Sequence, residues 1–414
     1  MTTSETLPGT APEETIGSPL AHPAFRWLLA GSSVSFLGNA IAPVALAFAV
    51  IDLGGSATDL GLVVGVYALA DVLAVLFGGV LGDRLSRTVM MQGAAIAAAG
   101  TQAVAAASLI GGWGSIGLLA GLGAVNGALG ALGGPSSRAI TQQTVPAALL
   151  PSAVAWRRLS QNVAQIVGFG SAGLLVAYLG SGWCLAIDAA GFAVAALCYA
   201  FVRVPRVVAP SGAVSMLGDV RAGALEVFRH TWLWMLILQA LLYHLFYGGA
   251  QGVLGPIVVG DAISRPAWGW ALGAMMTGFA VGGLISLRWR PRRLLYAGCW
   301  FLALTACFPA AMGLSDSLVV LLVGAFLHGL GLEIFSVAWD LAIQQNVAPD
   351  MLARVFAFDM LGSFIARPVG LALTGPVAEL VGYRTWLVVV SAVILGSCVV
   401  ALLVPDVRRL ERGS

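Results

Sequence analysis

The sequence has few charges, few cysteines and no lysine. Charged residues make up 10% of its 414 positions, and all 21 basic residues are arginines. The five cysteines lie inside apolar runs without C-x-x-C spacing, so we expect neither a disulfide framework nor a metal site. The sequence also offers no nucleophile constellation, phosphate-binding loop or soluble domain. We therefore do not expect an enzyme, a cofactor or a nucleic-acid partner.

Apolar residues dominate what is present. The chain is 59% hydrophobic, has a mean hydropathy of +0.92 and contains 53 glycines, which are common in membrane helices. A bilayer core needs about 20 apolar residues per helix, and the chain supplies twelve such runs. We place them near 26–51, 59–82, 88–110, 114–138, 154–180, 183–203, 231–260, 267–288, 293–313, 317–340, 355–381 and 384–404. The sequence thus predicts an all-α polytopic membrane protein with twelve transmembrane helices.

The arginines predict how the chain is oriented in the membrane. With a cytoplasmic amino terminus, all but three of the 21 arginines lie at the inner face. Arg265 and Arg384 lie outside it, and Arg367 lies within a span. Because basic residues collect on the cytoplasmic side, we expect both termini in the cytoplasm and the protein in the cell's plasma (inner) membrane.

A long interior connection divides the spans into two groups of six. Gln142–Val145 before the fifth span matches Gln344–Val347 before the eleventh, and Leu150 matches Leu352 at the same offset. Parallel repeats of this kind occur in secondary transporters, so we expect two pseudo-symmetric six-helix bundles. The predicted parts are a disordered cytoplasmic tail at 1–25, a first bundle at 26–203, a cytoplasmic linker at 204–230, a second bundle at 231–404 and a cytoplasmic tail at 405–414.

The charged loop Gly78–Thr88, G-G-V-L-G-D-R-L-S-R-T, joins the second and third spans. Together with the six-plus-six arrangement, its G-x-x-x-D-R-x-x-R pattern resembles the loop motif of the major facilitator superfamily. The matching residues are Gly79, Asp83, Arg84 and Arg87. The resemblance implies a transporter that works by alternating access, usually as a monomer surrounded by lipid.

The motif departs from the family's pattern at several positions. Ser86 stands where a second glycine is usual, and Thr88 where another basic residue is usual. The second-half copy, Gly283–Arg293, keeps the glycine but has Leu287 in place of the acid. An inner gate built on this motif should therefore depend mainly on the first half.

Three further phrases resemble the drug-exporter branch that includes macrolide and siderophore efflux proteins. They are Thr144–Ala153, Gly168–Gly173 and Ala186–Ala190. The second departs from the exporter pattern, because Gly168-Phe169-Gly170 lacks the proline that often follows glycine there. The resemblance implies proton-coupled efflux of a small hydrophobic or amphipathic molecule. Uptake of a nutrient or metabolite, and a receptor of the same fold without transport, are the alternatives.

The family motif also implies a lock at the inner face. We expect Asp83 to pair with Arg138 or Arg87 and to face the start of the eleventh span when the inner side is closed. At the repeat offset, Arg138 lies on Asp340, so opposite charges could attract across the gate. Arg157 lies on Asp359 in the same way. The alternatives are that the loop charges only orient the loop and that the others are ordinary solvated helix ends.

Charges deep in the spans are a separate group, because a charge at mid-bilayer costs about 2.5–3.5 kcal/mol. The candidates for proton coupling are Asp71, Glu333, His328 and Arg367. Asp71 has no evident arginine partner in the first half, which makes it the preferred proton carrier, and Asp188 is a further acid in the sixth span. The alternatives are an Arg367–Glu333 pair and a histidine that only makes hydrogen bonds in the core.

In the family fold the central cavity is lined by the first, fourth, seventh and tenth spans. The candidate lining residues are Asn39, Asn126, Gln239, Tyr243, His244, Tyr247 and Gln251. Gln239, Tyr243 and Tyr247 share one helix face. A mostly apolar cavity with few polar groups suits an amphipathic organic substrate better than a sugar. Other aromatic residues, such as Trp268, would belong to the interfacial belt.

Overall fold

The computed structural model describes residues 18–82, 87–204, 216–289 and 291–410, and within these ranges the regular secondary structure is entirely helical. Twelve helical segments are long and apolar enough to cross a membrane, which confirms the predicted all-α polytopic fold. The first half contains α1 (Pro23–Asp52), α2 (Ala57–Gly82), α3 (Arg87–Ile110), α4 (Ile116–Thr144), α5 (Leu150–Leu179) and α6 (Ser181–Ala200).

The second half has more helices because three of its spans are interrupted. It contains α7 (Met216–Arg229), α8 (Thr231–Gly249), α9 (Gly255–Ala262), α10 (Arg265–Arg288), α11 (Leu294–Leu302), α12 (Cys307–Leu314), α13 (Leu318–Asn346), α14 (Leu352–Phe364), α15 (Arg367–Val381), α16 (Tyr383–Leu403) and α17 (Pro405–Arg409). Part of the connection that the sequence predicts between the halves is therefore helical. Helix α7 packs on α14, where Gly223 lies against the carbonyl of Arg354.

Each interruption lies next to a proline. Pro256 is in the first turn of α9, Pro309 lies in the first turn of α12, and Pro368 is in the first turn of α15. A proline has no backbone N–H, so the carbonyl four residues earlier has no helical partner. At Pro309 the carbonyl in question belongs to Thr305, which accepts a hydrogen bond from His328 Nδ1 at 2.7 Å. Pro309 thus interrupts the helix, and the side chain of His328 satisfies the carbonyl that is left without a backbone partner.

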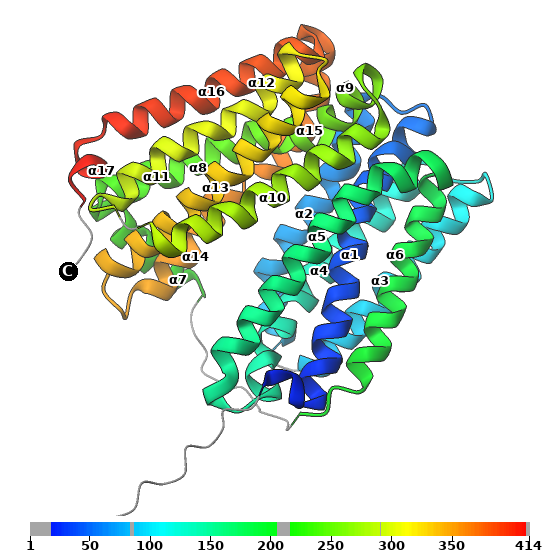
Figure 1. Cartoon of the computed structure of the whole chain (residues 1–414), viewed down its shortest axis with the longest axis horizontal. Coiled ribbons are helices and arrows are strands. Elements are labelled where there is room, and N and C mark those ends of the chain that lie inside the picture. The colour runs from blue at the N-terminus through cyan, green and yellow to red at the C-terminus, as the bar shows by residue number, and fades with distance from the viewer. Residues whose placement is uncertain (1–17, 83–86, 205–215, 290, 411–414) are drawn as a thin grey trace, which may run out of the picture.

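The two halves form separate six-helix bundles that meet through a small set of helices. Helix α5 packs on α10, and α2 packs on α15. Figure 1 shows the bundles converging near the labels α2, α9 and α15 and diverging toward α7 and α14. We call the meeting end the closed end; it carries the turns at 53–56, 180, 263–264 and 382. The opposite end, which carries residues 18 and 410, is the open end.

Glycines allow the close approach at the closed end. A Cβ atom at Gly375 of α15 would lie 2.4 Å from the carbonyl oxygen of Ala57 in α2. A Cβ atom at Gly269 of α10 would lie 2.8 Å from the carbonyl oxygen of Phe169 in α5. Such distances exclude any side chain, so the backbones themselves are in contact.

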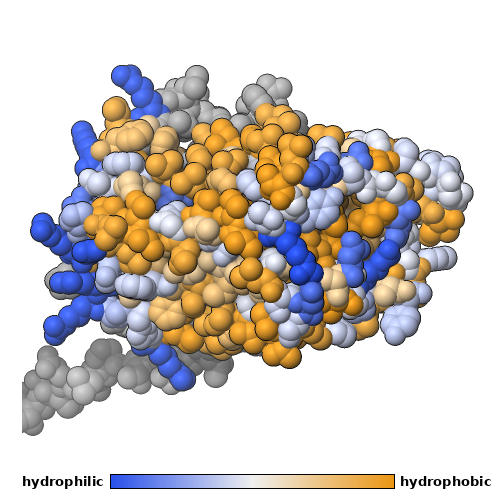
Figure 2. All heavy atoms as spheres, turned by 90° about the horizontal axis from the view of Figure 1, so that it is seen from above, coloured by the Kyte–Doolittle hydropathy of each residue, from blue (hydrophilic) through white to orange (hydrophobic). Residues whose placement is uncertain are grey.

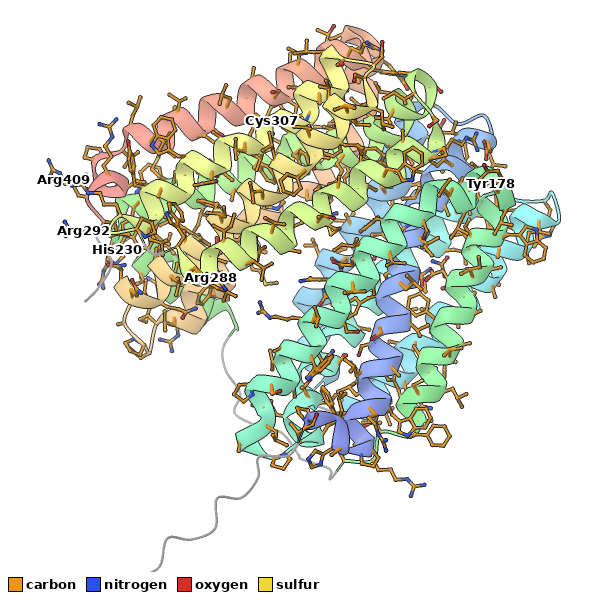
Figure 3. All side chains as sticks on the ribbon, in the orientation of Figure 1. Tyr178, His230, Arg288, Arg292, Cys307 and Arg409 are labelled. Atoms are coloured by element: carbon orange, nitrogen blue, oxygen red, sulfur yellow. The ribbon has the colours of Figure 1, made fainter. Side chains whose placement is uncertain are left out.

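Apolar and charged surfaces are segregated. Figure 2 shows hydrophobic side chains over the flank of the molecule and hydrophilic ones gathered mainly at one end. Arg288, Arg292, Arg409 and His230 all lie at the open end of the second bundle (Figure 3). Large apolar side chains such as Leu287 and Leu380 point outward, with 69% and 86% of their surface exposed. Twelve helices with such a surface identify a multi-pass membrane protein, because only lipid satisfies it.

Candidate functional site

An ion pair joins the two bundles at the closed end. Arg265 at the start of α10 donates to both carboxylate oxygens of Asp52 at the end of α1, at 3.0 Å to Oδ2 and 2.5 Å to Oδ1. The guanidinium also lies over the ring of Phe48, 5.0 Å from its centroid. A bidentate geometry fixes both partners in orientation. The link therefore holds α1 against α10 at this end.

A second polar link joins α2 to α15. The backbone N–H of Thr58 donates to Glu379 Oε1 at 3.0 Å, and its hydroxyl donates to Oε2 at 2.9 Å. Thr58 lies in the first turn of α2, where free amides and the helix dipole favour a carboxylate. The two links close the same end of the molecule. Sequence reasoning missed both, although Arg265 stood out as an arginine away from the predicted inner face.

Most of the predicted gating residues lie outside the description. Asp83 and Arg84 are not among the described residues, and the description of Arg87 and Arg138 does not extend to their side chains. Gly79 lies in α2. The expected Asp83 contact therefore stays a prediction.

Two of the remaining predicted gate charges, Arg157 and Asp359, form hydrogen bonds within their own bundles. Arg157 donates to the carbonyl of Ser137 at 2.6 Å, which joins α5 to α4. Asp359 of α14 accepts from Trp339 Nε1 and from Ser363 Oγ, both at 3.1 Å. Arg157 and Asp359 thus each form hydrogen bonds within one bundle, whereas Asp340 of α13 interacts electrostatically with Arg158 of α5.

Two of the proton-coupling candidates interact electrostatically from opposite bundles without forming a described ion pair. Asp71 lies in the middle of α2, and Arg367 begins α15, close enough for the two charges to interact. Arg367 packs its aliphatic part near Gly248 of α8 and also acts electrostatically on His244. The arginine that acts electrostatically on Asp71 therefore comes from the second half of the chain. The alternative pairing of Arg367 with Glu333 is not observed among the described ion pairs.

Glu333 instead lines a cavity between the bundles. The cavity has a volume of about 220 Å³ and is lined by Asn162 and Gln165 of α5, Met276 and Phe279 of α10, and Glu333 of α13. Arg158, one turn before Asn162, is the positive charge that acts on Glu333. The sequence marked Glu333 as a mid-span charge but gave no signal for its neighbours.

His328 is fully hydrogen-bonded inside the second bundle. Its Nδ1–H donates to the Thr305 carbonyl, so Nε2 accepts from the hydroxyl of Tyr243 at 2.9 Å. Tyr247 stacks on the same imidazole with the ring centroids 4.3 Å apart. The histidine is 1% exposed. This geometry matches the alternative of a hydrogen-bonding core histidine.

The predicted face of the seventh span exists, but it is turned away from the first bundle. Gln239, Tyr243 and Tyr247 are all buried, and Gln239 Nε2 donates to Ser397 Oγ of α16 at 3.4 Å. Tyr247 donates to Met275 Sδ at 3.5 Å. These three residues therefore form part of the second bundle's core in this structure. Shared periodicity predicted their common face, while the packing partner depends on the tertiary arrangement.

The other cavity candidates lie apart from one another. Asn39 on α1 is exposed and donates to Ser35 Oγ at 3.3 Å, and Asn126 on α4 accepts from Thr101 Oγ1 at 2.9 Å. His244 Nδ1 bonds to the carbonyl of Ala240 at 2.8 Å. Gln251 lies in the π-helical segment Ala250–Leu254 between α8 and α9 and is half-buried.

Asp188 on α6 is a buried acid in the first bundle. It is 1% exposed and accepts from Gln102 Nε2 of α3 at 2.7 Å. Its other oxygen, Oδ1, has no hydrogen-bond partner and lies against Gly38 of α1, where a Cβ atom would be 2.1 Å away. The buried carboxyl of Asp188 therefore requires glycine at position 38, because any side chain there would clash with Oδ1.

Comparison with known proteins agrees with this architecture. The chain is 28% identical to the multidrug efflux pump Tap of Mycolicibacterium fortuitum, over 96% of this chain and 98% of the relative. It is 25% identical to the macrolide efflux protein A of Streptococcus pyogenes, over 94% and 97%. The crystal structure of the nucleoside transporter NupG superposes with a TM-score of 0.75 at 14% identity, over 91% of this chain and 98% of that one. The Major Facilitator Superfamily model matches residues 28–259, and the chain belongs to that family.

Proposed function

We propose that this transporter exports a small hydrophobic or amphipathic molecule, driven by protons and working by alternating access. Full-length similarity to two efflux proteins supports export. The observation that carries alternating access is the asymmetry of the two ends. Asp52–Arg265 and Thr58–Glu379 join the bundles by hydrogen bonds at one end, whereas toward the other end Arg157 bonds to Ser137 and Asp359 to Trp339, each within its own bundle.

The open end faces the cytoplasm in this proposal. Arg288, Arg292 and Arg409 lie at that end (Figure 3), and the positive-inside rule assigns such a face to the cytoplasm. The structure then corresponds to a state that takes up substrate from the cytoplasm or the inner leaflet. The charged loop at 83–87 and its partners close this end in the opposite state. The protein works as a monomer in the plasma membrane.

Asp71 is the proton carrier in the proposed mechanism. It interacts electrostatically with Arg367 of the other bundle. Rocking of the bundles changes the distance between these two groups, because they belong to different halves. A proton bound at Asp71 would thus be linked to the conformational state.

Transport into everted membrane vesicles with an imposed proton gradient tests the proposal. We expect gradient-dependent accumulation of macrolides or lipophilic cations by the wild type. Asp71→Asn should abolish dependence on the gradient, whereas Asp350→Asn, an exposed carboxylate beyond α13, should behave as the wild type. Transport only in the opposite direction would indicate uptake. Binding without flux would indicate a receptor, and an unaltered gradient dependence in Asp71→Asn would exclude Asp71 as the carrier.

A further inference from the structure

Helix α7 lies at the open end of the second bundle, where it packs on α14 and on the start of α8 (Figure 1). One side of the helix is fixed by this contact. A Cβ atom at Gly223 would lie 2.5 Å from the carbonyl oxygen of Arg354, and Val227, one turn later, is fully buried. The backbones are too close for α7 to roll on α14, so the opposite side of α7 points away from the bundle.

That opposite side carries two arginines and two large apolar side chains. Arg221, Leu225, Phe228 and Arg229 have the spacing that places residues on one helix face, and all four are exposed. Leu225 and Phe228 leave 59% and 65% of their surface uncovered. The ring of Phe228 meets only the edge of the packed region, with its centroid 6.3 Å from that of Phe358 in α14. We call these four residues the outer face of α7.

The acidic residues of α7 fall on its packed side. Asp219 is four residues before Gly223 and Glu226 is three after it, so helical spacing places the three together. The side chain of Glu226 is 14% exposed and accepts a hydrogen bond from Arg229 at 2.9 Å, while His230 Nε2 lies 3.3 Å from its other oxygen. Charge is thus divided across the helix, with arginines on the outer face and acids on the other.

The outer face lies at the level where a membrane span begins. Only His230 separates the end of α7 from the start of α8, which crosses the membrane from Thr231 onward. Arg221 takes part in none of the ion pairs between described residues. The face therefore offers an uncompensated guanidinium next to apolar side chains, at the depth of the lipid headgroups.

We propose that the outer face of α7 binds the surface of a bilayer that contains anionic phospholipids. Leu225 and Phe228 insert at the boundary between headgroups and acyl chains, and Arg221 and Arg229 contact lipid phosphates. Because α7 is in backbone contact with α14, this anchor also fixes the depth of the first half of the eleventh span. The inference does not depend on the transported substrate or on the direction of transport.

The test measures where the outer face lies relative to lipid and water. A nitroxide is attached at Leu225→Cys in the full-length protein, in nanodiscs of phosphatidylcholine alone or mixed equally with phosphatidylglycerol. Cys307→Ser removes the one native cysteine that is not buried. Collisions of the nitroxide with oxygen report insertion into lipid, and collisions with nickel-EDDA report exposure to water. The two leaflets of a nanodisc have the same composition, so the orientation of the protein does not affect the result.

We expect the label to be inserted in the mixed lipids and to shift toward water in phosphatidylcholine alone. Arg221→Gln should lower the ratio of inserted to aqueous label in the mixed lipids about fivefold, and Arg221→Lys should restore most of it. Phe228→Ala should lower the ratio by about tenfold or more in both lipids, because its loss is apolar. These side chains are exposed, so the variants retain the packing of α7.

Two controls and three outcomes decide the test. Arg384→Gln at the closed end should leave the ratio unchanged, and a label at Asp350→Cys should meet water in both lipids. Exposure of the Leu225 label to nickel-EDDA in both lipids would show that water covers the outer face. Shielding from both reagents would show that protein, such as the first bundle, covers it. Equal insertion in both lipids, with no effect of Arg221→Gln, would refute recognition of anionic lipid.

Discussion

Arg265 and Asp52 lie 213 residues apart in the sequence and form a bidentate ion pair that spans the two bundles. Their side chains are 36% and 42% exposed, so water screens the attraction. Pairs of this kind contribute about 0.2–1 kcal/mol each. The link therefore biases the closed end toward closure without locking it, as the proposed alternating-access mechanism requires.

Arg265→Gln is expected to raise the fraction of molecules in which the bundles have separated at the closed end, by at most about fivefold. Electron-paramagnetic-resonance distances between spin labels on the α1–α2 and α9–α10 turns would measure the shift. Arg384→Gln is the matched control, since Arg384 pairs with Asp316 at the same end but within the second bundle. An equal shift in both variants would show that the effect is not specific to the bundle interface.

Gly375→Ala should have a larger effect than loss of the ion pair. The added Cβ atom would lie 2.4 Å from the carbonyl oxygen of Ala57, so α2 and α15 must move apart. Overpacking of this kind costs about 1–3 kcal/mol. We expect a wider closed end in the same distance measurement and slower transport. Gly396→Ala on α16, where no atom lies within 4 Å of the new Cβ position, should resemble the wild type.

Tyr243→Phe should lower thermal stability without changing the pH dependence of transport. It removes the hydroxyl that donates to His328 Nε2 and leaves a buried acceptor unsatisfied, at a cost of about 1–3 kcal/mol. Tyr247→Phe should lose less, because the hydroxyl of Tyr247 donates to the weak acceptor Met275 Sδ at 3.5 Å. Thermal unfolding followed by fluorescence compares the two. An altered pH profile in Tyr243→Phe would return His328 to the proton-coupling candidates.

Gly38→Ala should disrupt the first bundle. The new methyl group would lie 2.1 Å from Asp188 Oδ1, and moving that buried carboxyl would disturb its hydrogen bond to Gln102. We expect a poor yield of folded protein in gel filtration. Asp188→Ala in the same background should recover part of it by removing the clash. Gly100→Ala on α3, which meets open space, is the control. Normal yield of Gly38→Ala would show that α1 and α6 adjust easily.

The sequence predicted the twelve spans because a long apolar run is stable in lipid as a transmembrane helix. It also identified the superfamily through the six-plus-six pattern and the loop motif, and both predictions are confirmed. The i, i+4, i+8 spacing correctly placed Gln239, Tyr243 and Tyr247 on one face. Periodicity cannot say which helix that face meets, and here it meets the core of the second bundle.

The closed-end links could not be predicted because their partners are distant in sequence. Thr58 and Glu379 are 321 residues apart, and neither belongs to a local motif. The expectation that Trp268 lies in the interfacial belt was wrong. Its ring is 3% exposed and packs against Phe308 and Gly255, since Gly255 leaves room for an indole between α9 and α10. The Asp71–Arg367 relationship likewise required the bundles to be placed together.

The hydrogen bond from His328 to the Thr305 carbonyl has a mechanical consequence. Pro309 removes a backbone hydrogen bond inside the ninth span. The imidazole of His328 replaces it with a hydrogen bond from the tenth span, which joins the two spans where the ninth is interrupted. In the proposed alternating-access mechanism each bundle moves as a rigid body, so it must not bend where its helices are interrupted. The hydrogen bond from His328 stiffens the second bundle, so that the rocking motion takes place at its boundary with the first bundle.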